Sequence, residues 1–187
     1  MPPKAKFTKS EIVEAALSIA RSEGFEALTA RALGERLESS ARPLFTVFRS
    51  MDEIRQAVIA AARAMYKEYI RRGLLETPAF KGVGTQYILF SVNEPKLFRL
   101  LFMNEYADTP TLSSVLPIID ENYNAILASV KDGYGLSRET AERLYRHLWI
   151  YTHGIAALCA TNTCRFTGEE IDTMMTEVFI GLLKSLS

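Results

Sequence analysis

The chain of 187 residues is long enough for one sizeable domain, or for a small domain joined to a larger one. With 48% apolar and 24% charged residues it has the composition of a folded protein, which excludes a disordered chain. Its formal net charge of zero argues against a protein that coats nucleic acid through charge alone. No apolar run approaches the roughly 18 residues of a membrane span and no signal core is visible, so we expect a cytoplasmic protein.

In chain order, the first 50 residues predict three short helices. Thr8 and Glu11 form a capping-box pattern that opens a helix over 9–23. Thr29 is the N-cap expected for a second helix, which ends at Leu37.

A third, very short helix follows, for which Ser39 or Ser40 is the expected cap. We expect three of its apolar side chains to face the first helix: Leu44, Phe45 and Phe48. Three polar side chains are expected to stay outside: Arg42, Thr46 and Arg49.

The remainder also has helical periodicity, and alternating strand patterns are almost absent. A second capping box, at Ser50 and Glu53, opens a long helix over 51–73. Proline, glycine and polar segments then separate further expected helices over 79–92, 95–105, 110–131, 137–162 and 168–186. The sequence predicts an all-α fold with domains over 1–50 and 51–187, connected by the helix 51–73.

Three short helices with a shared core have two interpretations. A short outward helix held by two others is the geometry of a helix-turn-helix, in which the second helix of the pair enters the DNA major groove. Serine and arginine near its N-terminus suit phosphates, because free N–H groups and the helix dipole attract anions there. A plain three-helix corner of a larger bundle fits the pattern equally well.

Residues 12–54, IVEAALSIARSEGFEALTARALGERLESSARPLFTVFRSMDEI, resemble without gaps the N-terminal DNA-binding region of the tetracycline-repressor (TetR/AcrR) family of transcriptional regulators. The resemblance implies a helix-turn-helix. It implies phosphate contacts from Thr29, Arg31 and Ser40. It implies base contacts from Ala41, Arg42, Pro43, Phe45 and Thr46, of which Arg42 is the best candidate because arginine can bond guanine O6 and N7 together.

The chain departs from the family pattern at three positions. Glu38 stands where a turn glycine is common, and a left-handed backbone there would cost on the order of 1 kcal/mol. Val47 replaces a usual histidine, and Met51 replaces a lysine that contacts phosphate. Arg49, two residues before Met51, is the candidate to supply that charge.

Two further segments, EPKLFRLLFM at 94–103 and WIYTHGIAAL at 149–158, resemble a C-terminal ligand-binding and dimerisation region of one branch of these regulators. The resemblance implies a helical sensor domain. Aromatic and sulfur-containing side chains with one histidine are the candidate ligand contacts, although aromatics at helical spacing also form plain core. They are Tyr66, Tyr87, Phe90, Phe102, Met103, Tyr106, Tyr145, Trp149 and His153.

The last two expected helices carry wide apolar stripes that must be covered, either by a second copy of the chain in a four-helix bundle or by the chain's own core. The candidate dimer-interface residues are Leu148, Tyr151, Ile155, Met175, Val178, Phe179, Leu182 and Leu186.

The leading functional hypothesis is a ligand-responsive DNA-binding transcriptional regulator. It would act as a homodimeric repressor on a near-palindromic operator, and a small, largely apolar molecule would release it. A helical small-molecule-binding protein or adaptor that has lost DNA binding is the alternative, suggested by Glu38 and Met51.

An enzyme has less support, because no nucleophile–base pair, carboxylate pair or glycine-rich phosphate loop is recognisable. Cys159 and Cys164 are the only cysteines and have no metal-site spacing, so we expect reduced thiols, no metal and no cofactor.

Overall fold

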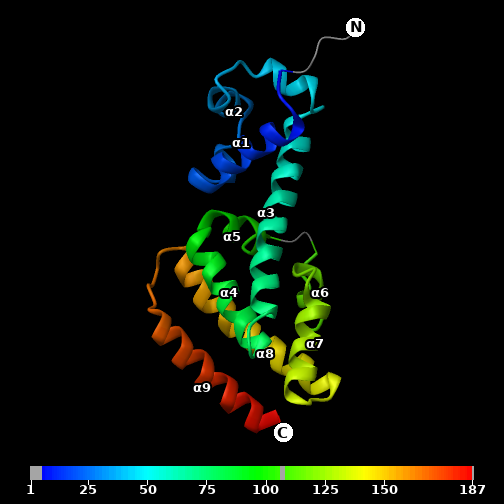
Figure 1. Cartoon of the computed structure of the whole chain (residues 1–187), viewed down its shortest axis with the longest axis vertical. Coiled ribbons are helices and arrows are strands. Elements are labelled where there is room, and N and C mark those ends of the chain that lie inside the picture. The colour runs from blue at the N-terminus through cyan, green and yellow to red at the C-terminus, as the bar shows by residue number, and fades with distance from the viewer. Residues whose placement is uncertain (1–5, 106–107, 187) are drawn as a thin grey trace. The chain divides into compact units, whose positions relative to one another are not determined.

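The computed structural model describes residues 6–105 and 108–186 (Figure 1). Throughout these ranges the regular secondary structure is helical and contains no strand, which confirms the predicted all-α fold. Within the same ranges, no helix has the length and apolar character that crossing a membrane requires.

The chain divides into two compact units. The first unit consists of Met1–Tyr66 and Lys96–Met103, and the second of Lys67–Pro95 and Asn104–Ser187. The long predicted helix over 51–73 is present as α3 (Met51–Leu74), which begins in the first unit and ends in the second.

The first unit is built mainly from short helices, and its first two α-helices begin at the expected caps. It contains α1 (Lys9–Ser22), η1 (Phe25–Ala27), α2 (Ala30–Arg36), η2 (Arg42–Thr46) and α5 (Pro95–Phe102), besides the start of α3. Thr8 and Glu11 form the predicted capping box: the Thr8 hydroxyl accepts from the Glu11 N–H at 3.2 Å, and the Glu11 carboxylate accepts from the Thr8 N–H at 2.7 Å. Thr29 caps α2 by accepting from the Ala32 N–H at 3.1 Å.

The short third helix differs from its prediction in type and in cap. It is a 3₁₀ helix, η2, whose N-cap is Ala41, and neither Ser39 nor Ser40 caps it. Leu44 is 0% and Phe48 1% exposed, but Phe45 is 46% exposed, so the expectation that Phe45 faces α1 is wrong. A 3₁₀ helix turns about 120° per residue, which directs the neighbour of an inward side chain toward solvent.

The second unit surrounds α4 with other helices. Its elements after α3 are α4 (Ala79–Asn93), α6 (Val115–Ile119), α7 (Tyr123–Tyr134), α8 (Arg138–Ala160) and α9 (Gly168–Leu186). α4 packs against α7 and α8, and α8 also packs against α7 and α9. Most bounds agree closely with the predicted ranges.

One predicted helix, over 110–131, is instead the pair α6 and α7. The break lies at Asp120, whose backbone is extended and whose carboxylate accepts from the Asn122 N–H at 2.8 Å. Such a local bond from an aspartate side chain competes with the helical pattern and ends the first helix.

α3 and α4 meet through backbone at two glycines. A Cβ on Gly73 would lie 2.7 Å from the Val83 Cα, and a Cβ on Gly82 would collide with the Gly73 carbonyl oxygen. No side chain fits at either position without moving the helices apart, so the end of α3 is fixed against the start of α4.

Candidate functional site

The predicted DNA contacts all lie on the surface of the first unit. Ala41 and Pro43 are half-buried, and the other predicted contacts are exposed: Thr29, Arg31, Ser40, Arg42, Phe45, Thr46 and Arg49. Leu44 and Phe48 lie between them in sequence but point into the core, which anchors η2 and leaves its polar side chains outward.

The turn between α2 and η2 contains a left-handed residue at the position where the family commonly has a glycine. Glu38 has φ 49°, a conformation that costs a non-glycine residue about 1 kcal/mol or more. The Ser39 N–H donates to the Gly34 carbonyl at 2.9 Å and the Glu38 N–H to the Glu35 carbonyl at 3.1 Å, which is the Schellman end of a helix. A Cβ on Gly34 would lie 2.9 Å from the Ser39 carbonyl oxygen, so the turn is held tightly against α2.

The cations of the first unit differ in whether a carboxylate neutralises them. Arg31, a predicted phosphate contact, pairs with Glu35 at 2.9 Å, and this hydrogen bond and charge raise the pKa of its guanidinium. Arg36 joins α2 to α1 by bonding Glu23 at 2.8 Å and the Ser18 hydroxyl at 2.6 Å.

Two further arginines, Arg42 and Arg49, have exposed side chains. Arg42 forms no ion pair with any residue in the described ranges. The backbone N–H of Arg49 donates to the Glu53 carboxylate at 2.7 Å, and this bond lowers the pKa of Glu53. The Arg49 side chain stays exposed. Lys9 pairs with the same carboxylate at 3.6 Å.

Four of the predicted ligand contacts come together in the second unit. Tyr87 Oη and His153 Nδ1 are 2.9 Å apart, and the Trp149 and His153 rings stack at 5.3 Å. Burial raises the pKa of the Tyr87 phenol far above its ordinary value, and burial lowers the pKa of His153. Tyr87, Trp149 and His153 therefore form a hydrogen-bonded aromatic cluster.

Asp120 belongs to this cluster and was not predicted. It is 5% exposed, and its negative charge adds to burial in raising the pKa of both Tyr87 and Tyr145. Tyr145 stacks on Tyr123 at 5.8 Å and meets the Phe80 ring edge-on at 5.8 Å. An acidic residue ending the apolar run VLPII was the available signal, but sequence spacing could not place it beside Tyr87.

The other predicted ligand contacts lie elsewhere. Phe90 is fully buried and meets Tyr69 edge-on at 5.2 Å. Tyr66 and Phe102 contact each other at 4.8 Å in the first unit, to which Met103 also belongs. Tyr106 lies outside the described residues. Within the described ranges, no group of three or more His, Cys, Asp or Glu side chains could hold a metal ion.

The predicted dimer residues separate by burial. Leu148 and Ile155 are 2% and 3% exposed within the single chain and have almost no surface left for a partner. The other candidates are half-buried: Tyr151, Met175, Val178, Phe179, Leu182 and Leu186.

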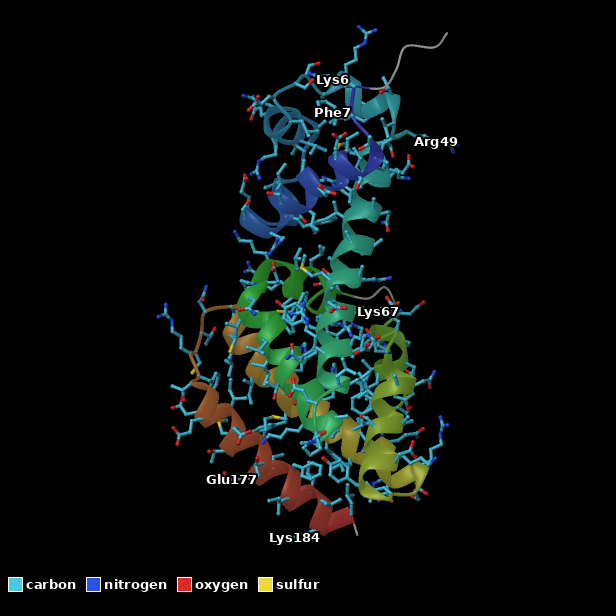
Figure 2. All side chains as sticks on the ribbon, viewed as in Figure 1. Lys6, Phe7, Arg49, Lys67, Glu177 and Lys184 are labelled. Atoms are coloured by element: carbon cyan, nitrogen blue, oxygen red, sulfur yellow. The ribbon has the colours of Figure 1, made fainter. Side chains whose placement is uncertain are left out.

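α9 lies against its own unit without burying any residue fully. The Phe179 ring meets Tyr134 at 4.9 Å, and the Thr152 hydroxyl lies 3.5 Å from the Met175 sulfur. Glu177 and Lys184 are on the exposed face of the helix (Figure 2). Further large apolar side chains of α8 and α9 are exposed: Ile150, Leu158 and Ile180.

Comparison with known families gives one match, over residues 80–179, to the family model described as "Tetracyclin repressor-like, C-terminal domain". No curated protein matches the chain significantly. The matched segment begins in α4, ends in α9 and contains the whole aromatic cluster with Asp120.

Proposed function

Because this chain belongs to the tetracyclin repressor-like family, we propose that it is a ligand-responsive, DNA-binding transcriptional regulator. It acts as a repressor that binds a near-palindromic operator as a homodimer. Residues 1–50 form the DNA-binding domain, and residues 51–187 form the sensing and dimerisation domain, with α3 as the connection.

The DNA-binding proposal rests on one observation: polar side chains of η2 and of the turn before it are exposed in a row. Arg42 is exposed at the start of η2 and forms no ion pair within the described ranges, while Leu44 and Phe48 hold η2 on the core. An arginine held in this way can read guanine in the major groove. Thr29, Arg31, Ser40 and Arg49 flank it as phosphate contacts.

The dimer surface is the apolar face of α9 together with the exposed apolar side chains of α8. A 19-residue helix without a buried residue leaves a wide apolar stripe partly open to water. A second copy of the chain covers this stripe in a four-helix arrangement. The surface excludes Leu148 and Ile155, because the chain's own core already covers them.

The effector site is the cluster of Tyr87, Tyr145, Trp149 and His153 in the second unit. The cluster is mostly aromatic with few polar groups, which suits a small, largely apolar molecule anchored by one or two hydrogen bonds. Such a molecule releases DNA only to the extent that it binds the DNA-free state more tightly, and operator DNA weakens its binding by the same factor.

The test is binding of the parent protein and two arginine variants to duplexes from the DNA flanking its own gene. Arg42→Ala should lose about 1–3 kcal/mol at the cognate duplex and discriminate less against a scrambled duplex. Arg31→Ala should weaken both duplexes alike and flatten the salt dependence. Arg63→Ala, at an exposed position of α3, is the control and should bind as the parent does.

The alternative, a helical small-molecule-binding protein or adaptor without DNA binding, is favoured by Glu38 and Met51 at positions where the family has glycine and lysine. A parent protein that binds no flanking duplex above its affinity for scrambled DNA would support this alternative.

A further inference from the structure

The segment before α1 is tied to the turn that leads into η2. The Lys6 ammonium donates a hydrogen bond to the Ser39 hydroxyl at 3.0 Å, across 33 positions of sequence. Ser39 directly precedes Ser40, Ala41 and Arg42, so Lys6 reaches the start of the proposed DNA-contacting row. Figure 2 labels Lys6 and its neighbour Phe7 at this end of the first unit.

Lys6 also differs in its charge environment from most cations around it. It is exposed, and within the described ranges it forms no ion pair with a carboxylate. Lys9 and Arg31, by contrast, are paired with Glu53 and Glu35. A hydroxyl acceptor such as Ser39 is neutral, so it orients the Lys6 ammonium without cancelling its charge.

The partner of Lys6 is itself held in place. Glu38 is left-handed, the Ser39 N–H bonds the Gly34 carbonyl at 2.9 Å, and Gly34 has no room for a Cβ against this turn. The bond to this turn therefore holds the Lys6 charge close to the start of η2. The Lys6 ammonium lies 5.1 Å from the centre of the Phe7 ring, which restricts it further.

We propose that Lys6 is a further DNA contact of this protein, a phosphate clamp donated by the segment before α1. The ammonium binds a backbone phosphate beside the one contacted by Ser40 and carries no base preference. The inference rests on the proposed DNA-binding function and extends its interface beyond the residues 29–49. Lys6 adds an unpaired positive charge to a surface on which Arg31 is paired with Glu35.

The competing explanation is that Lys6 only braces the turn through its bond to Ser39. Two variants separate charge from bracing. Lys6→Gln removes the charge and keeps a side-chain donor for Ser39, whereas Ser39→Ala removes the bond and keeps the charge. Lys67→Ala, at an exposed lysine of α3 in the second unit, is the matched control for removing one positive charge.

Affinity of each variant is measured by fluorescence anisotropy on the flanking-DNA duplex and on a scrambled duplex, in a salt series. Lys6→Gln should reduce the slope of log K against log salt by about 0.9 for each protomer bound, and weaken binding about fivefold per protomer at 0.15 M salt. The loss should be equal on both duplexes. Ser39→Ala should keep the parent slope, and Lys67→Ala should match the parent in slope and affinity.

An unchanged slope for Lys6→Gln, with the helical circular dichroism signal intact, overturns the phosphate contact. Equal losses in Lys6→Gln and Ser39→Ala without any change of slope assign Lys6 to bracing instead. A parent protein that prefers no flanking duplex contradicts the proposed function, whereas salt-dependent parent binding with a normal Lys6→Gln slope contradicts this inference alone.

Discussion

α1 and α9 begin with the same sequence signal and differ in what covers them. Thr8 with Glu11 and Thr167 with Glu170 form reciprocal capping bonds at nearly equal distances. Both helices then carry apolar residues at intervals of three and four. In α1 four of these residues are 0–1% exposed, whereas in α9 none is buried.

The difference shows that an apolar stripe specifies which face of a helix needs cover but not what provides it. α1 is covered within its own unit, where it packs against α2 and η1. α9 packs against α8 of its own unit, but none of its residues is buried, so part of its apolar stripe stays exposed to water. Four predictions test this contrast.

The largest effect is expected from charge on the α9 stripe. Phe179→Glu together with Leu182→Glu should raise the Kd of the dimer by at least about 100-fold, because burying unpaired carboxylates costs several kcal/mol. Sedimentation should show monomer at concentrations where the parent is dimeric. Thr173→Glu with Thr176→Glu adds the same charges at exposed positions of α9 and should stay dimeric. If the parent protein is a folded monomer, a second copy does not cover α9 and the contrast between the two helices is wrong.

Truncating an apolar side chain to alanine should have a different effect on stability in α1 and in α9. Ile19→Ala in α1 should lower the free energy of unfolding by about 2–5 kcal/mol at every protein concentration, because Ile19 is 1% exposed within its own unit. Leu182→Ala in α9 should cost stability that depends on protein concentration, because in the proposed dimer a second copy of the chain covers Leu182. Denaturation at two protein concentrations measures both. The same concentration dependence in both variants would show that one surface covers both helices.

The next effect concerns the free energy of unfolding and the left-handed turn at Glu38 in the first unit. Glu38→Gly should raise the free energy of unfolding by about 0.5–1 kcal/mol, since glycine avoids the left-handed penalty but loses more backbone entropy on folding. Glu38→Ala keeps a Cβ and should gain nothing. The gain should not vary with protein concentration, and equal stability of the two variants would show that the turn is unstrained.

The smallest effect concerns pH and the aromatic cluster around His153. Burial lowers the pKa of His153 below 6.5, so at acidic pH the unfolded chain binds its proton more readily than the folded chain does. Its contribution to stability is complete above about pH 6.5 and is lost as the pH falls through the folded-state pKa. His153→Gln should flatten the decline of stability below pH 6.5, measured by urea denaturation. His147→Gln, at an exposed position, should not.

Local signals in the sequence predicted most elements. Capping boxes, proline and glycine act within a few residues, so the starts of α1, α2, α3 and α9 follow from them directly. The split at Asp120 was missed, because a single side-chain bond to Asn122 overrides the helical periodicity on either side. The outward turn of Phe45 was missed because the 3₁₀ geometry of η2 was not expected.

The candidate sites depended more on contacts between distant residues. Tyr145, Trp149 and His153 share a helix face, and the prediction that they act together needed only the spacing of residues along α8. Tyr87 joins them through packing of α4 on α8 and Asp120 through the end of α6, which no spacing along the chain encodes. The bond from Lys6 to Ser39 likewise depends on how α2 ends.

The glycine contact between α3 and α4 makes the end of α3 a fixed joint within the second unit. Gly73 and Gly82 leave no space between the backbones, so the last turn of α3 must move with the first turn of α4. Residues 67–74, the part of α3 that belongs to the second unit, therefore follow any rotation of the start of α4. Substituting alanine at Gly82 would force the two backbones apart and loosen this joint.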